Sequence, residues 1–117
     1  MTHKDLKVWQ LSVDLVLEVY KLSKELPSDE KFGLISQIKR SSVSVPSNIA
    51  EGAGRGSNKE FVRFINIASG SLSELETQLI IIQKLEYYDT SIIVDEIIVI
   101  IRKMLYKLKQ SLLSKQK

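Results

Sequence analysis

Four stretches of the chain carry apolar residues three and four positions apart, which is the spacing of one face of an α-helix. In residues 5–26 the predicted apolar face consists of Leu6, Trp9, Val13, Val16 and Tyr20. Pro27 then interrupts the pattern, because proline does not fit inside a regular helix. The spacing predicts a first helix over residues 5–26.

The second stretch, residues 28–52, contains an internal proline. Ser28 is the expected N-cap, with acidic residues directly after it in the first turn. Pro46 cannot donate a hydrogen bond to the carbonyl of Ser42, and its ring crowds that turn. Because apolar positions continue to Ile49, we expect a helix that is kinked at Pro46 and then resumes. Its predicted face comprises Leu34, Ile35, Ile38, Ser42, Val45 and Ile49.

The third stretch opens with a capping box, in which Ser57 is followed three residues later by Glu60. Apolar residues then alternate at spacings of four and three over three heptads, which is the pattern of a continuous packing seam. The next break falls at residues 87–90. The predicted seam is Phe61, Ile65, Ala68, Leu72, Leu75, Leu79 and Ile82.

The fourth stretch, residues 91–114, is apolar over more than one face. Its predicted seam is Ile93, Ile97, Ile100, Met104, Leu108 and Leu112. Further isoleucines at positions 92, 98 and 101 widen this face. A helix that is apolar over so much of its circumference needs a second covering surface, so we expect an oligomer.

Four helices with short connections predict an all-α fold, an antiparallel up-down-up-down four-helix bundle, with residues 1–117 as a single domain. Small polar residues gather on either side of Pro46 and again at residues 69–73. We expect two helices to approach closely there, with Asn48 and Glu51 bonding across to Ser69, Ser71 or Glu74. The alternative is a polar groove that binds a ligand.

The composition argues against enzyme chemistry. The chain has no cysteine, and its one histidine is His3, near the end of the sequence. The Glu-x-x-His pairs of di-iron bundles are missing, so we expect no metal, no cofactor and no catalytic residue. The apolar runs are too short to span a bilayer, and the first residues do not form an apolar secretory signal. A cytoplasmic location is the expectation.

The charge is unevenly distributed. The net charge is +3, yet residues 102–117 hold six basic residues and no acidic one, so the rest of the chain is slightly acidic. Such a basic tail suggests an anionic partner. The alternative is a solvated helix end whose positive charges suit the helix dipole. The candidate phosphate contacts in this tail are Arg102, Lys103, Lys107 and Lys109.

A second group of basic residues surrounds the glycine-rich segment 52–56. Arg55 precedes the third helix, while Lys59 and Arg63 lie four residues apart within it, so the three should share one end of the bundle. A helix N-terminus also favours an anion. The segment lacks the P-loop and dinucleotide patterns, however, and a simple helix–helix turn is the alternative. Exposed aromatic residues for base stacking are scarce, with Tyr87 and Tyr88 the one pair in a turn.

Three motifs together resemble one bacterial family of four-helix bundles. They are V-S-V-P-S-N-I-A-E-G-A-G-R at 43–55, E-F-V-R-F at 60–64 and G-S-L-S-E-L-E-T-Q-L at 70–79. Two further motifs fit the same family, D-L-K-V-W-Q at 5–10 and F-G-L-I-S-Q-I-K-R at 32–40. The family is named for proteins encoded in intervening sequences of large-subunit ribosomal RNA genes. The resemblance covers residues 5–89 and implies a homopentamer with a central channel. Proteins related to this family include the accessory variability protein of diversity-generating retroelements, which binds a reverse transcriptase and nucleic acid.

The resemblance places Arg40, Arg55 and Arg63 within the matching motifs, and these are the arginines that we expect to face an anion. Asn48, Glu51 and Glu74 also lie in the motifs and are expected to be structural. The sequence therefore predicts a non-enzymatic oligomer that binds RNA or DNA through phosphate contacts. The alternative is a scaffolding oligomer that docks a protein such as a polymerase or reverse transcriptase.

Overall fold

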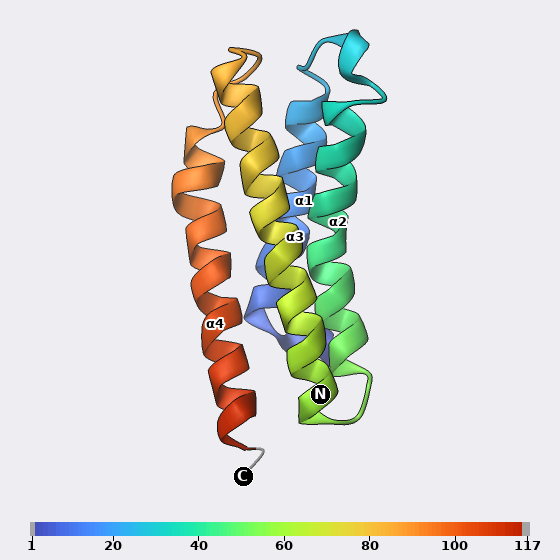
Figure 1. Cartoon of the computed structure of the whole chain (residues 1–117), viewed down its shortest axis with the longest axis vertical. Helices are drawn as coiled ribbons and strands as arrows, with labels where there is room; N and C mark the ends of the chain where they lie inside the picture. Colours follow the sequence, from blue (N-terminus) through green and yellow to red (C-terminus); the bar gives the residue numbers. More distant parts are fainter. Residues whose placement is uncertain (1, 116–117) are drawn as a thin grey trace.

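The computed structural model describes residues 2–115 as a helical bundle (Figure 1). Consecutive long helices run in opposite directions, and the molecule is elongated, with extents of 49 × 23 × 20 Å. The described residues contain no strand, so the predicted all-α four-helix bundle is confirmed. The long helices are α1 (Lys7–Ser23), α2 (Leu34–Ala53), α3 (Asn58–Lys84) and α4 (Ile98–Ser114). The short elements are the 3₁₀ turns η1 (His3–Asp5) and η2 (Ser28–Glu30) and the π-helical stretch η3 (Ile93–Ile97).

Helix α1 buries a different stripe from the predicted one. The residues that it buries are Val8, Ser12, Leu15, Val19, Leu22 and Ser23. The predicted stripe lies at the edge of the core, where Trp9 is half-buried and Tyr20 is exposed. Their rings carry polar groups that favour such an edge. The buried Ser12 hydroxyl is satisfied because it donates to the Trp9 carbonyl at 2.8 Å.

Helix α2 begins later than predicted. Ser28 starts η2, and Gly33 has backbone dihedrals (φ −105°, ψ −111°) that interrupt the helical path. The N–H of Leu34 donates to the Glu30 carboxylate at 3.3 Å, so Glu30 supplies the end contact that was assigned to Ser28. The helix then continues through Pro46 to Ala53. Its resumption beyond the proline is confirmed, and the kink stays a prediction.

Hydroxyl and amide groups join α2 to α3, although through other pairs than predicted. The Ser44 and Ser71 hydroxyls lie 2.7 Å apart, and Ser41 donates to the side-chain carbonyl of Gln78 at 2.8 Å. Asn48 does not reach α3 and donates instead to the Ser44 carbonyl at 2.8 Å. Among residues 2–115, no buried side-chain nitrogen or oxygen lacks a partner. These groups therefore serve helix packing.

Helix α3 follows its predicted seam. All seven residues of the heptad pattern are buried except Phe61, which is half-buried. Ser57 is the N-cap, and its hydroxyl accepts from the Glu60 N–H at 3.1 Å. The Glu60 side chain does not complete the capping box, because it binds Arg63 instead. The N-cap is thus confirmed and the reciprocal half of the box is wrong.

The π-helical stretch changes the register of α4. A π-helix closes its hydrogen bonds at i→i+5 and so takes up one extra residue. The buried face therefore passes from Ile93 to Ile98, five positions on, and the predicted seam position Ile100 is 50% exposed. The seam predicted for the fourth helix is therefore wrong at Ile100, while Ile97, Met104 and Leu108 are half-buried at the edge of the core. The residues buried on α4 are Ile98, Ile101, Leu105 and Leu112.

Candidate nucleic-acid interface

The turn between α2 and α3 brings two guanidinium groups onto one aromatic ring. Gly56 takes a positive φ of 82° in this turn, and Ser57 then caps α3. The Arg55 and Arg63 guanidinium carbons lie 4.9 Å and 4.4 Å from the centre of the buried Phe64 ring. Cations at this distance from a ring are attracted by its quadrupole. Phe64 thereby fixes both arginines at this end of the bundle.

Carboxylates accompany these arginines. Glu51 pairs with Arg55 at 3.3 Å, and Glu60 accepts two hydrogen bonds from Arg63, at 3.1 Å and 3.2 Å. The hydrogen bonds from Arg63 hold the pKa of Glu60 below its usual value against a partial desolvation, and the positive charges of Arg63, Arg55 and Lys59 add to the effect. The predicted grouping of the three basic residues is therefore present. We call Arg55, Lys59 and Arg63 the turn cluster.

Two further candidate arginines are also paired. Arg40, on α2, forms an ion pair with Glu74 of α3. Arg102, on α4, donates to both carboxylate oxygens of Glu76, at 2.9 Å and 3.3 Å, and to the Ser73 hydroxyl at 3.3 Å. Both residues thus link neighbouring helices and are partly neutralised. All four candidate arginines hold a carboxylate partner.

The candidate lysines differ from the arginines in this respect. Within residues 2–115, no carboxylate oxygen lies within 4.0 Å of the amines of Lys59, Lys103, Lys107 and Lys109. Lys103 and Lys107 are exposed and lie one helical turn apart, whereas Lys109 is half-buried. Lys117, also in the predicted basic tail, lies outside the described residues. Lys103 and Lys107 therefore carry the most accessible positive charge of α4.

Sequence reasoning missed one aromatic residue between these lysines. Tyr106 is 63% exposed and directly precedes Lys107. Val99, Arg102 and Lys103 complete a shallow concavity of about 420 Å³ along the outer face of α4. The sequence signal for this surface was an aromatic residue off the predicted apolar seam, between two lysines. It could not be used because the register shift at η3 changes which face of α4 is outermost. We call Lys103, Tyr106 and Lys107 the α4 strip.

The tyrosines that the sequence offered for stacking are less suitable. Tyr87 is half-buried, and its hydroxyl donates to the Glu30 carboxylate at 3.2 Å. This hydrogen bond raises the pKa of the Tyr87 phenol, assisted by desolvation and by the negative charge of Glu30. Tyr88 is 40% exposed, but the residues that follow it are acidic or neutral up to position 101. Neither tyrosine is flanked by free cations as Tyr106 is.

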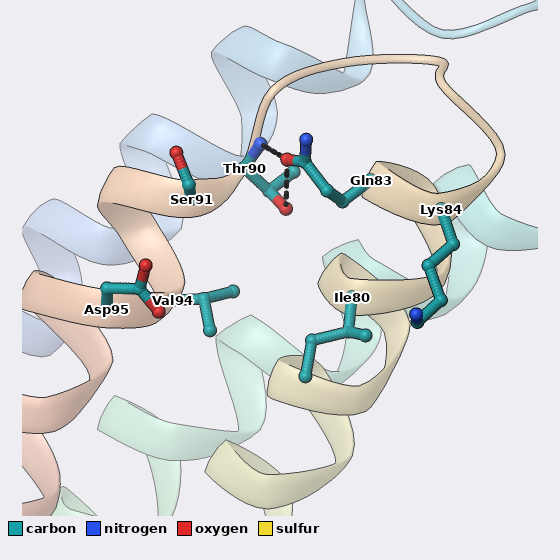
Figure 2. Close-up of a pocket in the computed structure, with 7 residues that line it drawn as sticks. All are labelled: Ile80, Gln83, Lys84, Thr90, Ser91, Val94 and Asp95. Atoms are coloured by element: carbon teal, nitrogen blue, oxygen red, sulfur yellow. Dashed lines mark hydrogen bonds between the residues drawn. The ribbon is translucent and has the colours of Figure 1, made fainter.

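A second concavity, of about 260 Å³, lies where α3 ends and η3 begins (Figure 2). Within it the Gln83 side-chain carbonyl accepts from the Thr90 N–H at 2.6 Å. The Thr90 hydroxyl donates to the Leu79 carbonyl at 2.8 Å. Lys84 and Asp95 stand on opposite sides of the opening. The polar groups of Gln83 and Thr90 are bonded within the protein, so they hold the turn between α3 and η3 in place.

The described residues give no other chemical centre. Across residues 2–115, no group of three or more His, Cys, Asp or Glu side chains is arranged to hold a metal ion. His3 packs edge-on against Trp9 with ring centres 5.1 Å apart, and is therefore part of a packing contact. None of the helices in this part of the chain is long and apolar enough to cross a membrane.

Comparison with known proteins identifies the family. No curated protein matches the chain. A solved structure from Bacteroides thetaiotaomicron, described as a protein of unknown function from the S23 ribosomal protein family, is similar over 94% of this chain and 98% of its own, with 27% identity and a TM-score of 0.65. Residues 4–109 match the family described as 23S rRNA-intervening sequence protein, which agrees with the resemblance of the motifs. The chain therefore belongs to the 23S rRNA-intervening sequence protein family.

Proposed function

We propose that this protein is a non-enzymatic, cytoplasmic homo-oligomer that binds RNA or DNA through phosphate contacts. The α4 strip carries the proposal, because its two exposed lysines have no carboxylate partner among the described residues. A lysine without a carboxylate partner releases counterions when it meets a phosphate, which favours binding. The turn cluster would add a weaker contribution, since Arg55 and Arg63 must share their charge with Glu51 and Glu60.

Assembly would multiply this charge. The family resemblance implies a homopentamer, and a ring would repeat the α4 strip around its axis. Apolar side chains support assembly, because Ile92 is 66% exposed and Ile100 is 50% exposed. Large exposed apolar residues that recur along a helix are typical of a surface that a second chain covers. A single strip with two lysines would bind weakly, whereas several strips acting on one strand would bind tightly.

The dependence of nucleic-acid affinity on salt concentration tests whether binding rests on phosphate contacts. If a ring neutralises about six phosphates, the affinity should fall about a thousandfold between roughly 50 mM and 200 mM salt. The loss should be similar for different sequences, because phosphates carry no sequence information. Binding that depends on base contacts would show a shallower salt dependence and a preference among sequences.

The experiment compares two double variants of equal charge. The first variant, Lys103→Ala with Lys107→Ala, removes the cations of the α4 strip. The control, Lys21→Ala with Lys24→Ala, removes one exposed lysine in the last turn of α1 and the exposed lysine at its C-cap. Affinity for a labelled RNA and a labelled DNA is measured at low and moderate salt, with the molar mass in solution determined in parallel. We expect a large loss and a shallower salt slope in the first variant alone. Equal losses in both variants would refute the assignment to α4.

The second candidate function is a scaffold that docks a protein, such as a polymerase or reverse transcriptase. The same exposed isoleucines favour it, because apolar side chains at the surface suit a protein partner as well as a second copy. Docking through an apolar face would change little with salt. An oligomer that binds no nucleic acid even at low salt would therefore leave this candidate in place of the first.

A further inference from the structure

We propose that the α4 strip binds single-stranded nucleic acid, with the Tyr106 ring stacking on a base while Lys103 and Lys107 hold phosphates. The inference rests on the proposed function and names the form of nucleic acid that this surface takes. Three observations carry it: the free face of the Tyr106 ring, the way in which Arg102 is held beside it, and the spacing of the two lysines.

The Tyr106 ring is largely exposed in the part of the chain that the structure describes. Its side chain is 63% exposed, and within residues 2–115 its hydroxyl makes no hydrogen bond. Elsewhere the chain covers aromatic rings with cations: Lys39 lies 4.8 Å from the Tyr20 ring centre, and two arginines lie over Phe64. The described residues place no cation over Tyr106, although four cations lie within four positions of it. Its face is therefore available to a planar partner.

Arg102 lies one helical turn before Tyr106, but its guanidinium binds α3 and does not cover the ring. Its guanidinium donates to both oxygens of Glu76 and to the Ser73 hydroxyl, all on α3. The arginine thus forms one wall of the concavity beside Tyr106 while its charge faces α3. The two hydrogen bonds to the carboxylate satisfy the planar guanidinium group, so a move onto the Tyr106 ring would break them.

The two lysines are placed to contact the phosphates of a strand that crosses the Tyr106 ring. Lys103 and Lys107 share one side of the helix, and Tyr106 lies about 60° around the axis from Lys103. All three side chains line the same concavity. The two lysines are about 6 Å apart along the helix axis. Flexible lysine side chains placed before and after a stacking ring suit a strand whose backbone continues in both directions from the stacked base.

A duplex cannot use this arrangement. Its bases are stacked on one another, so an aromatic side chain on a helix surface reaches only the phosphates and the groove edges. A single strand can place one base on the ring, and this contact tolerates any sequence because every base has a flat face. Replacement of a stacking residue by alanine weakens binding by about 5- to 150-fold. The α4 strip should therefore prefer a single strand to a duplex.

The test uses Tyr106→Ala, with Tyr106→Phe as the matched control that keeps the ring and removes the hydroxyl. Both are measured in the full chain against a labelled single strand of about 20 nucleotides and a duplex of the same length, at low and moderate salt. We expect Tyr106→Ala to weaken single-strand binding about 5- to 150-fold at both salt concentrations and to leave duplex binding unchanged. Tyr106→Phe should bind like the original protein.

The contrary outcomes are distinct. Equal binding by Tyr106→Ala and the original protein, or an equal loss for single strand and duplex, would overturn the stacking role while leaving phosphate binding intact. A changed molar mass for Tyr106→Ala would also overturn it, because the ring would then belong to a subunit contact. Failure of the original protein to bind any nucleic acid at low salt would refute the proposed function together with this inference.

Discussion

A methyl group on Gly52 would lie 2.7 Å from the Cβ of Phe64, closer than carbon atoms can approach without displacement. Gly52 is in the last turn of α2, and Phe64 is in the second turn of α3. The absence of a side chain at this position lets the two helices meet just before the turn that carries Arg55. Phe64 in turn holds both guanidinium groups of the turn cluster, so a glycine on one helix determines where two cations lie on the surface.

Gly52→Ala should therefore destabilise the protein. Alanine is the better helix former by about 1 kcal/mol, but here its methyl group must displace Phe64 or the helix, which costs about 1–3 kcal/mol. Gly70→Ala is the matched control, because a Cβ at Gly70 meets no atom within 4 Å and the helical backbone suits alanine. Chemical denaturation should show a net loss for the first variant and a gain of about 0.5–1 kcal/mol for the second. A gain at both positions would contradict the packing argument.

The π-helical stretch predicts an unusual tolerance of deletion. Removing Glu96, an exposed residue within η3, should allow a continuous α-helix in which Ile93 and the residue now numbered Ile98 keep facing the core. Removing Lys103, equally exposed but in regular α-helix, would instead rotate Leu105 and Leu112 by about 100° away from the core. We expect the first deletion to leave the thermal midpoint nearly unchanged and the second to lower it strongly. Equal losses would show that the π-helical stretch has a packing role of its own.

The accuracy of prediction differed among the helices for physical reasons. Helix α3 was predictable because its seam is narrow and strictly periodic, so one face alone could be buried. Helix α1 is apolar over a wider arc, and periodicity cannot choose between a stripe that contains Trp9 and one that contains Leu15. The choice depends on which side chains fit between the neighbouring helices. That information lies in the packing and not in the local pattern.

The candidate site was predictable to a similar extent. The turn cluster follows from a glycine-rich turn and a four-residue spacing, and both can be read from the sequence. The ion pairs that bind Arg40 and Arg102 could not be predicted, because each joins residues more than 25 positions apart on different helices. The exposure of Tyr106 depends on the extra residue taken up by η3, which has no sequence signal that we recognise.

Glu60 should contribute a pH-dependent part of the stability. Its pKa is lowered in the folded protein, mainly by the hydrogen bonds from Arg63, so the folded state favours the ionised form. The resulting stabilisation is present above the unfolded-state pKa of 4.5 and is lost as the pH falls through the lower, folded-state value. In Glu60→Gln the loss of stability between about pH 6 and pH 3 should be smaller than in the original protein. Denaturation midpoints across this range provide the measurement.

Glu18→Gln is a suitable comparison for the acid range. Glu18 is exposed on α1 and forms no ion pair with another described residue. Its substitution removes one surface carboxylate without removing an ion pair among the described residues. If Glu60→Gln loses as much stability between about pH 6 and pH 3 as the original protein, the contacts between Glu60 and Arg63 do not persist in solution.

Arg102 should act on stability more than on nucleic-acid binding. Its guanidinium binds Glu76 through its two terminal nitrogens and is partly shielded from solvent, so Arg102→Ala removes a bidentate link between α4 and α3 at a cost of about 0.5–1 kcal/mol. Arg102→Lys keeps the charge but cannot reproduce the planar fork, and should lose most of the same stability. Because Glu76 already partly neutralises this arginine, affinity for nucleic acid should change less than in Lys103→Ala. Parallel denaturation and binding measurements on the three variants separate these roles, and a loss of affinity in Arg102→Ala equal to that in Lys103→Ala would place Arg102 among the phosphate contacts.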